Sequence, residues 1–133
     1  MRRLTNINPA SLVESVARLE ADGTRAAVVG GGTDLLGMLK DDLAPAEVLI
    51  NLNGLRDRGS LDRVEIEVDG ICVGGLVTLT QLSRHPLVGG EYRVLAEAAG
   101  SAATPQIRNV GTIAGNICQR PWCWYFRQNF PCY

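Results

Sequence analysis

The amino-acid sequence predicts an α+β protein built in two parts. Apolar residues recur at helical spacing after Ser11, whereas apolar and acidic residues alternate strictly over 64–68, as they do in a half-exposed strand. A turn-rich segment, 53–62, lies between these patterns and marks a candidate boundary. We therefore expect a small first lobe at residues 1–54 and the start of a second lobe at residues 55–117.

Two helices and two strands are predicted in the first lobe. A capping-box pattern, Ser-x-x-Glu, precedes an amphipathic helix over 12–22. A buried strand is expected over 25–30, and Thr33 or Asp34 can cap a short helix that follows it. A second short strand over 47–51 completes a small βαβ-like unit.

The second lobe is predicted to begin with a β-hairpin. The alternating strand over 64–68 leads through a two-residue Asp-Gly turn into a return strand over 71–75. A second capping-box pattern at 78–81 begins a helix that must end before the next proline, and a further amphipathic helix is expected over 91–102. From residue 104 the chain becomes rich in glycine and asparagine, which predicts a polar loop.

Composition excludes several classes of function. The 133 residues carry a formal net charge of -1, and 46% of them are hydrophobic, which is typical of a globular domain. The sequence has no basic cluster, so we expect no nucleic-acid partner. It has no long apolar run either, so we expect no membrane span and no secretory signal, and a cytoplasmic location.

The cysteines are distributed unevenly. Cys72 stands in an apolar context and is predicted to be a small buried hydrophobic residue. Cys118, Cys123 and Cys132 lie close together near the C-terminal end, and a metal or cluster role is one interpretation of such a group of thiols. Zinc is disfavoured, because the spacing contains no Cys-x2-Cys pair and no histidine is nearby. The same end of the chain is unusually aromatic, which predicts that it packs onto another part of the protein or onto a partner segment.

Three consecutive glycines, Gly30 to Gly32, stand between the predicted strand and the helix that follows it. Glycines let backbone N–H groups approach a ligand closely, and phosphate is the usual ligand of such a loop. A tight strand-to-helix turn without a ligand is the alternative. The dinucleotide fingerprint Gly-x-Gly-x-x-Gly fails at Leu35, and the P-loop pattern fails at Met38. A nucleotide kinase or an ordinary nicotinamide dehydrogenase is therefore disfavoured.

The segment 104–120 is a second glycine-containing polar segment. Gly111 and Gly115 alternate with Thr112 and Asn116, and together they offer backbone N–H groups, a hydroxyl and an amide. A turn between two strands is the alternative. Two such segments far apart in the sequence favour one long ligand that spans both lobes, and a dinucleotide fits this description.

Both segments resemble motifs of a known family. The stretch GGGTDLLGMLK resembles the first FAD-binding loop of the xanthine dehydrogenase and carbon monoxide dehydrogenase family of molybdenum hydroxylases, and TPQIRNVGTIAGNI resembles its second flavin loop. The chain departs from the family at Gly30, where alanine is usual, and at Ala114, where glycine is usual. The resemblance implies the N-terminal part of a two-lobe FAD-binding fold of the vanillyl-alcohol-oxidase (PCMH) type.

The resemblance also implies which residues bind FAD. The pyrophosphate would lie against the first loop, and the flavin side would lie against the second loop with one alanine nearby. The implied residues are Gly30, Gly31, Gly32, Thr33, Asp34 and Leu35 in the first loop, Thr112, Ile113, Ala114, Gly115 and Asn116 in the second, and Ala103. Because a carboxylate repels phosphate, we expect Asp34 to cap the following helix or to bond the ribose. No catalytic acid or base is expected.

The stretch QRPWCWYFRQNFPC is similar to flavin subunits of the aldehyde oxidoreductase and 4-hydroxybenzoyl-CoA reductase type, in which an inserted loop carries a [4Fe–4S] cluster. The similarity implies that residues 118–133 begin this insertion and that Cys123 and Cys132 are two of the thiolate ligands. It also implies that the chain is an N-terminal fragment of a longer subunit, and we expect the fragment to be inactive by itself.

The implied function is electron transfer. Such a subunit would pass electrons from iron–sulfur clusters through FAD to an external acceptor, beside a molybdopterin-binding large subunit and a [2Fe–2S] small subunit. The alternative is a non-catalytic domain with an empty flavin cleft that acts in assembly or interaction. Retention of flavin by the purified chain distinguishes the two.

Overall fold

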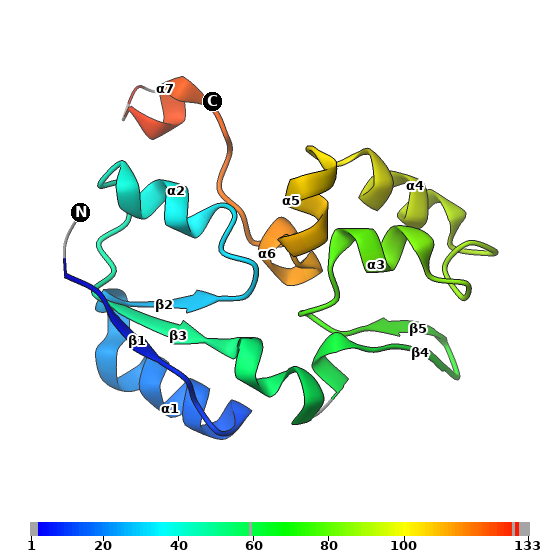
Figure 1. The fold of residues 1–133 in the computed structure, drawn as a ribbon, viewed down its shortest axis with the longest axis horizontal. Coiled ribbons are helices and arrows are strands. Elements are labelled where there is room, and N and C mark those ends of the chain that lie inside the picture. The colour runs from blue at the N-terminus through cyan, green and yellow to red at the C-terminus, as the bar shows by residue number, and fades with distance from the viewer. Residues whose placement is uncertain (1–2, 59, 129, 131–133) are drawn as a thin grey trace.

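The computed structural model describes residues 3–58, 60–128 and 130, and Figure 1 shows their arrangement. Helices and strands are mixed along the chain, which confirms the α+β class. The strands are β1 (Thr5–Ile7), β2 (Ala26–Val29), β3 (Val48–Asn51), β4 (Val64–Glu67) and β5 (Gly70–Val73). The α-helices are α1 (Leu12–Asp22), α2 (Leu35–Lys40), α3 (Leu79–Arg84), α4 (Arg93–Ser101), α5 (Pro105–Val110), α6 (Ile113–Ile117) and α7 (Trp124–Arg127), and the 3-10 turns are η1 (Gly23–Arg25), η2 (Leu52–Arg58) and η3 (Ser60–Asp62).

A three-stranded parallel sheet organises the first part of the chain. The strand order is β1-β3-β2, so β3 is central, and Leu49 pairs with Asn6 on one side and with Ala27 on the other. Leu49 packs in a cluster with Leu39 of α2, whereas Ile50, the next residue, faces the opposite side of the sheet. Figure 1 accordingly shows α1 and α2 on opposite sides of the sheet.

The predicted boundaries of α1 are confirmed. The Ser11 hydroxyl accepts a hydrogen bond from the Glu14 N–H at 3.1 Å, and the Glu14 carboxylate accepts one from the Ala10 N–H at 2.8 Å. The helix ends at Gly23, whose φ of +54° lies in the left-handed region that favours glycine. No helix of the described residues has the length and apolar character needed to cross a membrane.

The second part of the chain begins with the hairpin β4–β5, whose strands are antiparallel. Helix α3 has both halves of its capping box: the Thr78 hydroxyl accepts from the Gln81 N–H at 3.2 Å, and the Gln81 side chain accepts from the Thr78 N–H at 2.8 Å. Helices α3 and α4 pack against each other and against one face of the hairpin. The buried residues of this core are Val77, Leu79, Leu82, Val88, Ala96 and Ala99.

The prediction that Cys72 is buried is wrong. Ile71 and Val73 pack against the core of the second part, and Cys72 between them therefore faces the opposite, open side of the two-stranded sheet. There it lies directly across from Glu65 on the neighbouring strand.

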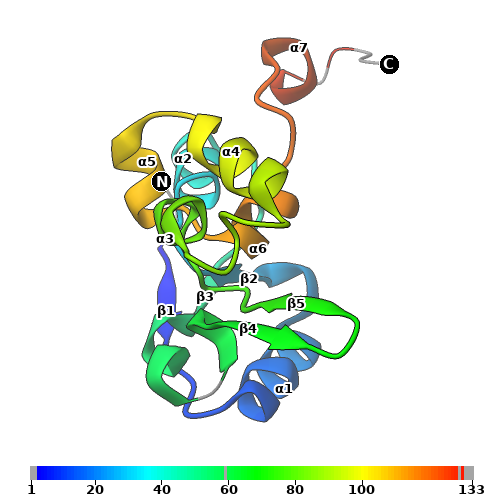
Figure 2. The ribbon, with the colours of Figure 1, turned by 90° about the vertical axis from the view of Figure 1, so that its right-hand side faces the viewer.

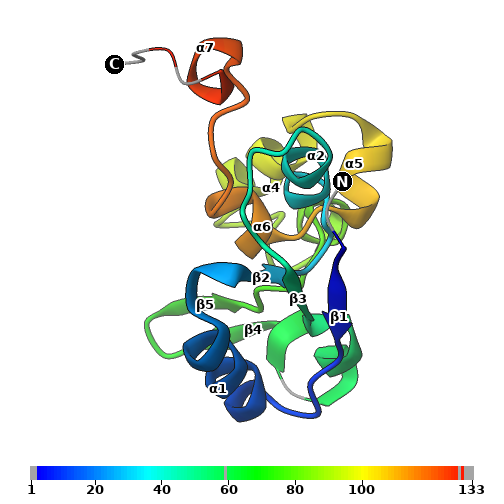
Figure 3. The same ribbon diagram turned by 90° about the vertical axis from the view of Figure 1, so that its left-hand side faces the viewer.

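The predicted polar loop after residue 104 is also wrong in its local structure, because two short helices, α5 and α6, occupy most of it. Thr104 and Thr112 cap these helices through their hydroxyls. After α6 an extended segment leads away to α7, which stands apart from α3–α6 in Figures 2 and 3 and lies above α2 in Figure 1.

Candidate functional site

The glycine segment forms the sharp connection between β2 and α2. Gly32 has a φ of +71°, and a Cβ built there would lie 3.1 Å from the Leu36 side chain. A Cβ on Gly31 would lie 2.8 Å from the Val110 carbonyl carbon and closer still to its oxygen. The connection therefore requires glycine at both positions, for a backbone conformation at one and for a close approach at the other.

This connection exposes backbone donors. Among the hydrogen bonds of the described residues, none uses the N–H groups of Gly31, Gly32 or Thr33. Successive N–H groups in a turn that includes a left-handed residue form a concave site with positive potential. The loop is thus chemically suited to an anion such as a phosphate group.

The two glycine-containing segments are in direct contact. Thr112 is 2% exposed, and its hydroxyl accepts a hydrogen bond from the Gly115 N–H at 3.2 Å. A Cβ on Gly30 would lie 2.9 Å from that same hydroxyl oxygen. Thr112 is in turn bridged to Thr78, with the Ile113 N–H donating to the Val77 carbonyl at 2.8 Å. The second segment is therefore fixed to the core of the second part and supports the first.

Asn53 is a positioning residue that sequence reasoning missed. Its Nδ2 donates to the Gly30 carbonyl at 2.8 Å and to Asn51 Oδ1 at 2.8 Å. The Asn51 side chain thus orients the amide that holds the glycine segment. The Asn-x-Asn pattern that begins at the last residue of β3 is the local signal, and such a pattern is typical of many turns.

Two cavities meet at these segments, with volumes of about 390 Å³ and about 190 Å³. Thr33, Asp34, Thr112, Gly115 and Gln119 line both of them, so the cavities adjoin each other. Of the residues implied as FAD contacts, those that line one cavity or both are Gly30, Gly31, Gly32, Thr33, Asp34, Leu35, Ala103, Thr112, Gly115 and Asn116.

The two other implied contacts, Ile113 and Ala114, do not line these cavities. Ile113 packs against the core of the second part, and a Cβ on Gly75 would lie 3.2 Å from Ala114 Cβ. Trp122 also lines the larger cavity, and the sequence did not indicate this role for it.

Ala103, which lines the larger cavity, has an uncommon backbone conformation. Ala103 has a φ of +47°, although it is not glycine. Arg108 Nη1 donates to the carbonyl oxygens of Ala102 at 2.8 Å and Ala103 at 3.0 Å. These two hydrogen bonds span the turn between α4 and α5 and give Arg108 a structural role.

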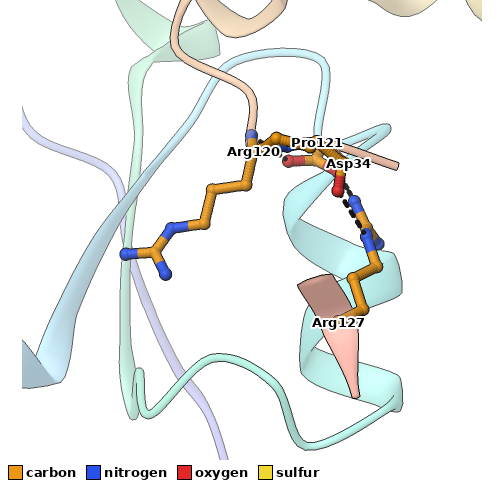
Figure 4. Close-up of polar contacts among 4 residues, drawn as sticks. All are labelled: Asp34, Arg120, Pro121 and Arg127. Carbon is orange, nitrogen blue, oxygen red and sulfur yellow. Dashed lines mark hydrogen bonds and ion pairs between the residues drawn. The ribbon is translucent and has the colours of Figure 1, made fainter. Parts of the chain in front are cut away.

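Asp34 does not cap α2, so that part of the expectation is wrong: it occupies the N-cap position without a side-chain hydrogen bond to the helix. Figure 4 shows its carboxylate turned toward the C-terminal segment instead. Oδ1 lies 2.6 Å from Arg127 Nη2, and Oδ2 accepts from the Arg120 N–H at 3.4 Å.

The implied iron–sulfur ligands do not form a ligand set among the described residues. Cys123 is half-buried at the start of α7, whereas Cys132 lies outside the described residues. No group of three or more histidine, cysteine, aspartate or glutamate side chains in the described residues could hold a metal ion.

An α+β fold with an anion-suited glycine turn beside a cleft defines a cofactor-binding domain. The chain belongs to the family described as the FAD binding domain in molybdopterin dehydrogenase, whose model matches residues 2–121. The fold is confirmed as the FAD-binding PCMH type by its similarity to carbon monoxide dehydrogenase from Hydrogenophaga pseudoflava, with a TM-score of 0.81 and 35% identity over 87% of this chain and 39% of that chain.

Among curated relatives, the chain is 39% identical to the aldehyde oxidoreductase FAD-binding subunit PaoB of Escherichia coli (strain K12), covering 80% of this chain and 33% of that protein. It is 37% identical to the nicotinate dehydrogenase FAD-subunit of Eubacterium barkeri, covering 68% of this chain and 30% of that protein. The chain thus spans about a third of the length of these relatives.

Proposed function

We propose that this chain is the FAD-binding part of an electron-transfer subunit of a molybdenum hydroxylase. The observation that carries the proposal is the contact between the two glycine-containing segments, which brings the free N–H groups of the first against the cavities lined by the second. FAD in this cleft would supply the redox chemistry, and no protein acid or base is required for that.

The residues of the cleft fit the parts of the cofactor. The N–H groups of Gly31, Gly32 and Thr33 would bind the diphosphate, because successive backbone donors favour an anion. Ala103, Gly115 and the other small residues of the larger cavity, whose volume is about 390 Å³, would line the space for the flat ring system.

We extend the proposal to the organisation of the whole protein. We divide the chain at 1–54, 55–117 and 118–133. The first boundary is supported by two apolar clusters that share no residue, one on each side of it. Two of the relatives are named as FAD subunits, which supports a multi-subunit enzyme, and the matching family is described as the FAD binding domain in molybdopterin dehydrogenase. We therefore propose a molybdopterin-binding large subunit and a [2Fe–2S] small subunit as partners, and a cytoplasmic location. In this proposal the chain by itself is inactive, because the large subunit would carry the substrate chemistry. A [4Fe–4S] cluster at 118–133 remains a hypothesis.

Flavin retention tests the proposal. The purified chain is mixed with FAD, passed through gel filtration and examined for flavin absorbance. We expect retained flavin in the wild type and none in Gly32→Val, because valine does not tolerate a φ of +71° beside Leu36. Gly90→Val is the matched control, since a Cβ at Gly90 meets no atom within 4 Å. A wild-type chain that retains no flavin contradicts the proposal.

The alternative, an interaction module with an empty cleft, has its own supporting observation. Trp124 is 82% exposed and Tyr125 is 67% exposed, and both lie in α7, apart from the cores. Large exposed aromatic surfaces are typical of binding sites for other proteins. A chain that folds but retains no flavin would favour this function.

A further inference from the structure

We propose that Arg127 is a positioning residue of the cofactor site that masks the charge of Asp34, so that an anionic diphosphate can occupy the adjacent glycine turn. This inference rests on the proposed function and deepens it. It concerns a contact between the first glycine segment and α7, two parts of the chain separated by 93 positions.

Asp34 creates an electrostatic problem for the site. Asp34 lines both cavities and directly follows Thr33, whose N–H is one of the three free donors. A carboxylate so close to a bound diphosphate would repel it, and the repulsion is stronger where water is partly excluded. A compensating cation is therefore needed for the donors to be effective.

Arg127 supplies this cation. The ion pair is short, and the side chains of Arg127 and Asp34 are only 10% and 15% exposed. In every other ion pair of the described residues the arginine side chain is at least 60% exposed. Among the ion pairs of the described residues, the Asp34–Arg127 pair is thus the one that solvent screens least.

The remaining contacts of Arg127 fix its position. Its Nε donates to the Pro121 carbonyl at 3.2 Å, and its guanidinium carbon lies 4.0 Å from the ring centroid of Trp122. Trp122 and Gln119 line the larger cavity. The same guanidinium therefore neutralises Asp34 and holds the segment that forms one wall of the cleft.

The chain also offers a matched control. Figure 4 shows the Arg120 side chain pointing away from Asp34, so that only its backbone N–H makes contact. Arg120→Met removes the same formal charge as Arg127→Met from a nearby position, but it leaves the ion pair and the Arg120 backbone contact in place.

The experiment measures FAD dissociation constants of the full 133-residue chain by quenching of flavin fluorescence. We expect Arg127→Met to weaken FAD binding at least about tenfold, equivalent to roughly 1.4 kcal/mol. Arg120→Met should stay close to wild type. Asp34→Asn should bind FAD at least as tightly as wild type, because it removes the repelling charge and leaves Arg127 positive.

A purely structural contact gives a different pattern. Both Arg127→Met and Asp34→Asn would then weaken binding alike, and this result would overturn the inference. Asp34→Asn gives this answer even if Arg127→Met fails to fold. Riboflavin, which lacks the diphosphate, is the second probe: Arg127→Met should affect it less than FAD, and equal losses would also overturn the inference. If the wild-type chain itself binds no FAD, the proposed function fails first; if it binds FAD and the variants behave alike, only the inference fails.

Discussion

Gly31 and Val110 meet backbone to backbone, and their contact joins the two glycine-containing segments. A Cβ on Gly31 would lie 2.8 Å from the Val110 carbonyl carbon and 3.0 Å from Gly111 Cα. Both neighbouring groups are backbone, so neither can move aside by a change of rotamer. The separation of the two halves of the cleft is consequently set at this one glycine.

We predict that Gly31→Ala lowers the free energy of unfolding by about 1–3 kcal/mol, because the added methyl forces the two segments apart. Urea unfolding of the purified chain measures the change. Gly90→Ala is the control, since an alanine Cβ there meets nothing within 4 Å. Equal stabilities of the two variants would show that the segments are not held at the observed separation.

The Arg108 side chain is expected to compensate for the conformation of Ala103. Arg108→Met removes the hydrogen bonds to the carbonyl oxygens of Ala102 and Ala103 and should cost about 1–3 kcal/mol of stability. In an Ala103→Gly background the cost should be smaller, because glycine adopts a φ of +47° without help. A double-mutant cycle by thermal or urea unfolding gives the coupling energy, and strictly additive effects would contradict the prediction.

Thr112 should matter more for stability than the equivalent cap on the preceding helix. Thr112→Val keeps the shape of a residue that is 2% exposed but leaves the Gly115 N–H without its acceptor, which should cost about 1–2 kcal/mol. Thr104→Val removes a longer, exposed bond of 3.4 Å to the Ile107 N–H and should cost less. The ranking is tested by the urea concentrations at which the two variants are half unfolded, provided that their free energies of unfolding depend on urea with the same slope.

The Cys72 thiol is expected to react slowly with alkylating reagents at neutral pH. The negative charge of Glu67 raises the pKa of this thiol, with smaller contributions from desolvation, a hydrogen bond to Glu67 and the charge of Glu65. A raised pKa means less thiolate at a given pH, and thiolate is the reactive form. Glu67→Gln should therefore lower the pKa and move the rate–pH profile to lower pH.

Iodoacetamide labelling read by mass spectrometry of the Cys72 peptide distinguishes this thiol from the other cysteines. Glu65→Gln is the matched control and should shift the profile in the same direction by a smaller amount, since its contribution to the pKa is the smaller one. A larger shift in Glu65→Gln than in Glu67→Gln would contradict the assignment.

Elements whose stability is decided locally were predictable from the sequence. The capping boxes located the starts of α1 and α3, because the residues that satisfy the first free N–H groups of a helix lie within a few positions of each other. Helices α5 and α6 were missed because their glycine and asparagine content suggested a loop. Thr104 followed by Pro105 was the available signal, since it places a capping residue before a proline at the first helical position.

The site was predictable only as two segments. The sequence located both, because glycines beside small polar residues are recognisable wherever they stand. Their mutual geometry was not accessible, since the contact of Gly31 with Val110 and the pairing of Asp34 with Arg127 depend on how distant parts of the chain pack. The exposure of Cys72 could have been predicted from the sequence, because alternation along β5 places its side chain on the other face of the sheet from Ile71 and Val73.

The separation of 93 positions between Asp34 and Arg127 also bears on the order of events in folding. Such a contact stabilises the protein only after a long stretch of chain has closed, so we expect the cleft to form after the local hairpin and helices. A ligand that binds the finished cleft stabilises interactions that the folding transition state has not yet made. Its occupancy should therefore slow unfolding strongly while leaving the folding rate almost unchanged, and the bound cofactor would prolong the lifetime of the native state.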